Sequence, residues 1–131
     1  MSKRDIYELI KFVESQIIFT IESTSNINYY EQFLDSMGAK VLFNSTCMCL
    51  QSIGETIKQI DDRTDKQLFA QYPNTPWKRV IGLRHIISHE YSSLDPEVIL
   101  ETVKNRLTPL LADINKIIDD INNGKHDAII N

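Results

Sequence analysis

The chain has 131 residues, of which 42% are hydrophobic and 24% charged, a mixture typical of one globular domain that excludes wholesale disorder. The formal charge of −4 argues against a protein that coats nucleic acid or anionic membrane by bulk charge. Four glycines and four prolines are too few for an all-β fold. The sequence shows no secretory signal and no apolar run of about 18 residues, so we expect a cytoplasmic protein with no membrane contact.

The first half of the chain predicts two long helices with a shorter segment between them. Apolar residues at spacings of three and four over residues 6–21 form one helical stripe. After a polar break, the amphipathic segment 29–37 is expected to end at Gly38. A long helix is predicted over residues 39–60, and Gly54 interrupts it at a cost in helix propensity. Such a glycine is often kept where another helix crosses closely, since it has no side chain to hold the backbones apart.

Two further helices are predicted by the same device, a capping residue followed by proline. Thr75 is a good N-cap, and Pro76 suits the first helical position, where no backbone N–H is needed. That helix is expected to end near residues 89–92. Asp95 and Pro96 repeat the pattern at the start of the last helix.

The last helix is expected to kink or restart at Pro109 and to end at Gly124, a predicted C-cap. The sequence therefore predicts an all-α, antiparallel bundle of four to five helices in a single domain, residues 1–124. Residues 125–131 are expected to form a flexible tail, in which His126 has no role.

The two cysteines do not predict a metal centre or a disulfide. Cys47 and Cys49 are two positions apart on a helix, so their side chains point in different directions. A single C-x-C without a second ligand pair is a poor zinc site. We expect buried free thiols, and no metal or other cofactor.

Positive charge is concentrated on the helix that begins at Pro76. Residues 76–91 hold three Lys or Arg and one acid, so this segment has a charge of +2 and the remainder −6. His85 and His89 lie in it as well. An arginine can clamp two phosphate oxygens, and an imidazole can transfer a proton at neutral pH. Cleavage of an RNA phosphodiester needs a group that stabilises the charge on the phosphate and a group that transfers a proton. The ribose 2′-hydroxyl is the nucleophile, so no metal is required.

The helical register limits how these residues can meet. At about 100° per residue, Arg84 shares one face with Ser88 and, two turns on, with Tyr91. His89 lies about 140° away from Arg84 on a regular helix. The pair meets at one phosphate only if the helix unwinds at its end or a second subunit completes the site.

The same segment resembles the HEPN-domain toxins of the HepT type. Arg84, four residues, His89, one residue and Tyr91 match the R-x4-H-x-Y motif of that family. Further similarities, in the family's order, are Ile53-Gly54-Glu55, Pro76-Trp77, Gly82-Leu83, Asp95, Val98 and Leu107-x-Pro109-x-Leu111. The likeness covers most of the chain between residues 53 and 111. Two departures are His85, where Asn commonly follows the motif arginine, and Leu100, where Trp is frequent.

The resemblance implies a HEPN-like homodimer whose motif helices face each other across a two-fold axis. It implies a metal-independent RNA endonuclease that acts as a toxin on tRNA or mRNA, with Arg84 and His89 as catalytic residues. The usual partner of such a toxin is a small nucleotidyltransferase of the MNT type, which serves as antitoxin and can transfer AMP to the motif tyrosine, Tyr91. Lys78, His85 and Ser88 are the candidate substrate-binding residues on the same helix.

A second class of function stays open. The chain could be a non-catalytic helical subunit that holds substrate for a nucleotidyltransferase, and Arg84 could simply pair with Glu55 or Glu90. His89 could stabilise the helix C-terminus, and Tyr91 could be an ordinary half-buried tyrosine. The presence of both Arg84 and His89 favours the nuclease, whereas the acidic net charge favours the binding subunit.

Overall fold

The computed structural model describes residues 2–90 and 93–130, with the backbone alone for residues 88–90. In this part of the chain there are four α-helices, two short 3₁₀ helices and no strand, which confirms the all-helical prediction. The α-helices are α1 (Lys3–Ser23), α2 (Met37–Arg63), α3 (Trp77–Glu90) and α4 (Pro96–Asn122), and the 3₁₀ helices are η1 (Tyr30–Phe33) and η2 (Phe69–Gln71).

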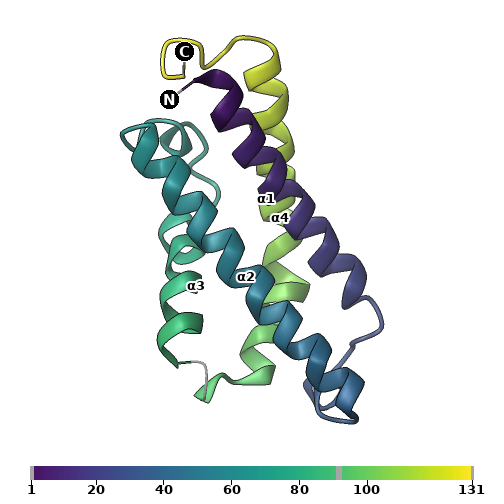
Figure 1. Ribbon diagram of the computed structural model, residues 1–131. Coiled ribbons are helices and arrows are strands. Elements are labelled where there is room, and N and C mark those ends of the chain that lie inside the picture. Colours follow the sequence, from purple (N-terminus) through teal and green to yellow (C-terminus); the bar gives the residue numbers. More distant parts are fainter. Residues whose placement is uncertain (1, 91–92, 131) are drawn as a thin grey trace.

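The long helices α1, α2 and α4 form the body of the bundle, and α3 packs on α2. Helix α1 contacts both α2 and α4, while the most extensive helix pairing joins α2 to α3 (Figure 1). Both ends of the chain lie at the same end of the molecule. Helix α3 is shorter than α2 and lies on the outside of it. The side of α3 that faces away from α2 is open, next to the first half of α4.

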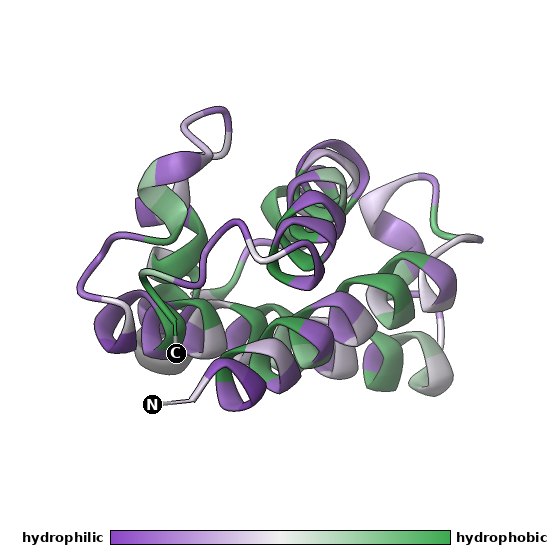
Figure 2. Cartoon of the chain, turned by 90° about the horizontal axis from the view of Figure 1, so that it is seen from above, coloured by the Kyte–Doolittle hydropathy of each residue, from purple (hydrophilic) through white to green (hydrophobic). Residues whose placement is uncertain are grey.

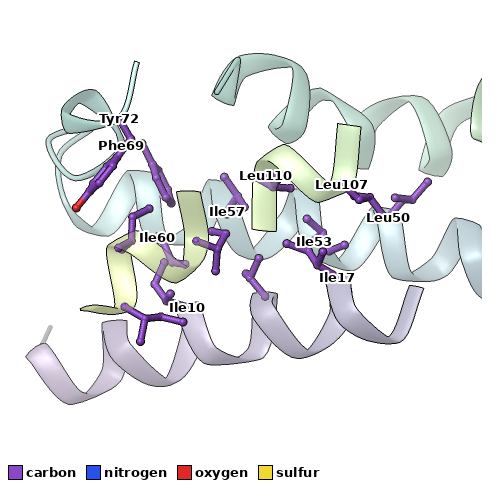
Figure 3. Close-up of a cluster of buried hydrophobic side chains, with 14 of the residues drawn as sticks. Ile10, Ile17, Leu50, Ile53, Ile57, Ile60, Phe69, Tyr72, Leu107 and Leu110 are labelled. Atoms are coloured by element: carbon purple, nitrogen blue, oxygen red, sulfur yellow. The ribbon is translucent and has the colours of Figure 1, made fainter. Parts of the chain in front are cut away.

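The core forms because the apolar stripes of the helices face one another. In the predicted stripe of α1, Ile10 and Ile17 are fully buried. They point toward Ile53, Ile57 and Ile60 of α2 (Figure 3). Viewed from above, each helix shows hydrophobic and hydrophilic sections in alternation, as amphipathic helices do (Figure 2). Each fully buried aliphatic side chain contributes about 1.5–3 kcal/mol relative to its exposed state.

The start of α2 differs from the prediction. The side chain of Ser36 accepts a hydrogen bond from the amide of Ala39 at 3.0 Å, so the helix begins at Met37. Gly38 therefore lies in the first turn of α2 and does not close the preceding segment. Of the amphipathic segment predicted over residues 29–37, Tyr30–Phe33 forms a 3₁₀ turn and Met37 already belongs to α2.

The start of α4 is as predicted, but its middle is not interrupted. The Asp95 carboxylate accepts a hydrogen bond from the amide of Glu97 at 2.9 Å, and Pro96 takes the first helical position. Helix α4 continues through Pro109 to Asn122, so the restart expected at this proline does not occur. Gly124 follows the helix with φ of +78°, a left-handed conformation that suits glycine and agrees with the predicted C-cap.

The C-terminal segment is packed against the bundle, contrary to the expectation of a loose tail. The amides of Ile129 and Ile130 donate to the carbonyl of His126, which continues the chain in turns after α4. His126 is 2% exposed, and Ile130 is buried in the main core. Burial of the apolar Ile130 side chain stabilises the packing of this segment against the bundle.

Both cysteines are free and buried, as predicted. Burial raises the pKa of the Cys47 thiol to about 11, so this thiol stays protonated and unreactive at neutral pH. Among the described residues, no helix combines the length and the apolar character needed to cross a membrane.

Candidate active site

The start of α3 is fixed to the rest of the bundle by polar contacts. The Thr75 hydroxyl donates to the carboxylate of Asp113 on α4. The indole Nε1 of Trp77 donates to the backbone carbonyl of Tyr72 at 2.8 Å, and its ring stacks on Phe69 with 4.2 Å between centroids. The N-terminal end of α3 is therefore held in a fixed position on the bundle.

A buried polar group extends this anchor to the C-terminal segment. The Tyr72 hydroxyl donates to Oδ2 of Asp120 at 2.6 Å and lies 2.5 Å from Nε2 of His126. Burial lowers the pKa of His126 and raises that of Tyr72, while the hydrogen bond from Tyr72 lowers the pKa of Asp120. At neutral pH the group therefore combines a neutral imidazole, a neutral phenol and an ionised carboxylate. The prediction that His126 has no role is wrong.

No local pattern in the sequence connects the members of this group, so it was not predictable. Tyr72 lies in the polar connection between α2 and α3, 54 positions before His126. Only the packing of the tail against that connection brings them together.

On its inner side, α3 crosses α2 at Gly54 with almost no space between the backbones. A Cβ atom at Gly54 would lie 2.8 Å from the carbonyl oxygen of Val80, 3.0 Å from the amide nitrogen of Arg84 and 3.4 Å from the Arg84 Cβ. The close crossing expected from this mid-helix glycine is confirmed. Farther along the same side, Ile87 is 2% exposed and packs in the core.

On its outer side, α3 borders an open apolar groove of about 490 Å³ that it forms with α4. Apolar side chains from both helices line it: Val80, Leu83, Ile86, Val98, Leu107 and Leu110. Ile86 is 46% exposed and Val98 56%. The rim is charged, with Arg79 from α3 and, from α4, Arg106 and Glu101, whose Nε and Oε2 atoms are 3.4 Å apart. Arg106 was not predicted as a site residue, since α4 has no local excess of positive charge.

The structure places three of the six predicted site residues with their side chains. Arg84 is half-buried at the crossing with α2, whereas Lys78 and His85 are exposed on α3. Ser88 and His89 belong to α3, but their side chains are outside the described part of the chain, and Tyr91 is outside it altogether.

The helix is continuous between the two predicted catalytic positions. Because α3 runs as one α-helix from Trp77 to Glu90, positions 84 and 89 lie about 140° apart around its axis. Helix unwinding between them, one of the two ways by which the pair could share a phosphate, does not occur. Among the described residues, no group of three or more His, Cys, Asp or Glu side chains is arranged to hold a metal ion.

Sequence comparison with known proteins identifies a family and several relatives. The profile of the family described as "Ribonuclease HepT-like" matches residues 6–117. Two proteins of Methanocaldococcus jannaschii are similar over 125 residues, or 92% of this chain. They are "Putative RNase MJ1216", 31% identical over 93% of its own length, and "Putative RNase MJ0125", 30% identical over 97%. No solved structure shows a significant match.

The chain therefore belongs to the HepT-like ribonuclease family, as the resemblance of its sequence to the HepT type implied. The protein is a ribonuclease. The family match spans α1, α2, α3 and most of α4, so it includes both the crossing at Gly54 and the open groove.

Proposed function

We propose that the chain is a metal-independent RNA endonuclease that acts as the toxin of a toxin–antitoxin pair, with Arg84 and His89 as its catalytic residues. The observation that carries this proposal is the position of Arg84. It lies half-buried on a continuous helix, within residues 76–91, which have a net charge of +2 in a chain whose net charge is −4. An arginine in such a place suits a phosphate better than a surface ion pair.

The chemistry follows from what the two side chains can do. The ribose 2′-oxygen attacks phosphorus, the bond from phosphorus to the 5′-oxygen breaks, and a 2′,3′-cyclic phosphate remains. His89 serves the proton transfers, which remove the proton of the 2′-hydroxyl and supply one to the departing 5′-oxygen. The Arg84 guanidinium stabilises the extra negative charge on the phosphoryl oxygens in the transition state. Lys78, His85 and Ser88 contact the RNA backbone along the same helix.

A homodimer supplies the geometry that one chain lacks. Positions 84 and 89 of one helix diverge by about 140°, so Arg84 of one protomer works with His89 of its partner. The α3–α4 groove is the surface that suits such a contact, because it is apolar at its centre and has both Arg79 and Glu101 on its rim. A two-fold contact can bring unlike charges of this rim together. Ile87, buried within its own protomer, does not take part.

The proposed partner that controls the toxin is a nucleotidyltransferase of the MNT type. The hydroxyl of Tyr91 attacks the α-phosphate of ATP, pyrophosphate leaves, and the phenolic proton is lost to solvent. The phosphate attached at position 91 then competes with RNA for Arg84, and the adenosine obstructs the site. Mass spectrometry after incubation with ATP and the antitoxin should find AMP on Tyr91 and no cleavage by the modified protein. AMP on other residues alone, or full activity after modification, would refute this control.

The nuclease itself is tested by cleavage of RNA in the presence of EDTA. We expect products that end in a 2′,3′-cyclic phosphate or its opened form, and Arg84→Ala should slow cleavage by about a hundredfold or more. An absolute need for added divalent metal would contradict the mechanism. RNA binding without cleavage, unchanged by His89→Ala, would instead support the non-catalytic subunit that holds substrate for a nucleotidyltransferase.

A further inference from the structure

The contact between α2 and α3 at Gly54 involves the backbone of the proposed catalytic arginine itself. Two of the three atoms nearest to a Cβ built at Gly54 belong to Arg84, namely its amide nitrogen and its Cβ, and the third is the carbonyl oxygen of Val80, one turn earlier. A side chain can rotate away from a new neighbour, but backbone atoms inside a helix cannot. An added methyl group at position 54 must therefore displace the part of α3 that includes Arg84.

The other glycines within helices have no such contact. Apart from the atoms of its own helical turn, a Cβ at Gly38 would meet only the Oγ atom of Ser36 among the described residues, at 3.9 Å, and one at Gly82 would meet none of them within 4 Å. Close approach is therefore specific to position 54. It coincides with the turn of α3 that includes Arg84 and not with the anchored start of the helix at Trp77.

We propose that Gly54 is a positioning residue for Arg84: the missing side chain sets the depth at which α3 lies on α2, and so where the guanidinium meets the RNA phosphate. This inference rests on the proposed function, since it assumes that Arg84 binds phosphate. A guanidinium that clamps two oxygens depends on both the distance and the plane of approach, and misplacements of about 1 Å can cost a hundredfold in rate.

A role in stability alone would have different consequences. If Gly54 only allowed α2 and α3 to pack, then Gly54→Ala would lower the melting temperature, and the molecules that remain folded would bind RNA as before. If Gly54 positions Arg84, the folded molecules themselves would lose the phosphate contact. The number of phosphate contacts is measurable, because each contact with single-stranded RNA adds about 0.7 to the slope of log K against log salt concentration.

The experiment is a salt titration of binding to a single-stranded, mixed-sequence 2′-O-methyl oligoribonucleotide, followed by fluorescence anisotropy. The methyl group blocks the nucleophile, so the probe is not cleaved. The slope of log K against log salt concentration is negative, and for Arg84→Ala its magnitude should be about 0.7 less than for the wild type. Gly54→Ala should reduce the slope by the same amount, and the double variant should show no further reduction.

Two control variants separate position from stability. Ile60→Val removes a methyl group from the core of α2 and should lower the melting temperature while keeping the wild-type slope. Gly38→Ala adds a methyl group to the same helix in open space and should also keep it. If Gly54→Ala is poorly folded in buffer, all variants are titrated in trimethylamine N-oxide, which favours the compact state.

The outcomes are distinct. A wild-type slope for Gly54→Ala beside a reduced slope for Arg84→Ala would overturn the positioning role and leave the proposed function intact. A wild-type slope for Arg84→Ala would remove the phosphate contact from the proposed function, and the positioning role with it.

Discussion

The two sides of helix α3 differ in what they meet. On the inner side, Gly54 lets the backbones of α2 and α3 come together, and Ile87 is buried in the core. On the outer side, a Cβ built at Gly82 would have no described atom within 4 Å apart from those of its own helical turn, and Ile86 is 46% exposed beside the groove. A glycine inside a helix costs up to about 1 kcal/mol relative to alanine. Close packing within the protomer offsets this cost at Gly54, but nothing in the described part of the chain does so at Gly82.

The two sides of α3 therefore have different roles. The inner surface fixes the height and direction of Arg84 within the protomer. The outer surface is apolar, open and flanked by charges, which are features of a contact site for another molecule. A glycine there fits a surface that another backbone approaches closely.

The largest expected difference between the two sides is in stability. Ile87→Ala should destabilise the protomer by about 2–5 kcal/mol, because it leaves a cavity in the core. Ile86→Ala, one position away, should change the unfolding free energy by no more than about 0.5 kcal/mol. Urea unfolding at low protein concentration measures both. Equal losses would show that the two sides are not distinct.

The anchor at the start of α3 should respond to pH. His126 has a pKa below its ordinary value of 6.5, so the unfolded chain binds a proton at a higher pH than the folded one. Stability should therefore fall as the pH drops below about 6.5, and fall again below about 3.8 as Asp120 takes up a proton. The raised pKa of Tyr72 predicts a separate loss above about pH 10, where the unfolded phenol ionises first.

Melting temperatures measured across this pH range test the prediction. The variant His126→Gln should lose the change near neutral pH, whereas His85→Gln, which alters an exposed histidine of α3, should keep it. An unchanged profile in His126→Gln would show that the buried group does not control stability.

The smallest expected effect is at Gly82, and its sign is informative. Gly82→Ala should stabilise the isolated protomer by up to about 1 kcal/mol, since it improves helix propensity in open space. The same variant should weaken the dimer and its RNA cleavage, because the new methyl group stands where the partner approaches. Light scattering and unfolding together measure the two effects. A stabilised protein with unchanged assembly and activity would show that the outer face contacts nothing.

Local patterns predicted the helices, because burial of one stripe per helix is a property of neighbouring residues. The stripe of α1, the cap at Asp95 and the crossing at Gly54 were all predictable in this way. The R-x4-H-x-Y spacing, together with the family resemblance, directed attention to α3.

Features that depend on distant contacts were not predictable from local patterns. The tail from Lys125 is too short to show a periodic pattern, and only its docking against Tyr72 and the core explains the burial of His126 and Ile130. Pro109 was expected to kink the helix or to restart it, and the restart does not occur, because both halves of α4 pack against the bundle. The groove likewise depends on how the consecutive helices α3 and α4 are placed in space, which no local pattern sets.

If Arg84 of one protomer and His89 of the other form each active site, as proposed, mixed dimers of two inactive variants should regain activity. Arg84→Ala and His89→Ala chains are each expected to be inactive. Co-expression of the two, or exchange of subunits between them, gives mixed dimers in which one site lacks both residues and the other site is intact. A random mixture should therefore recover about a quarter of the wild-type cleavage rate. A mixture that stays as inactive as its parents, while native mass spectrometry shows that mixed dimers have formed, would contradict the shared site.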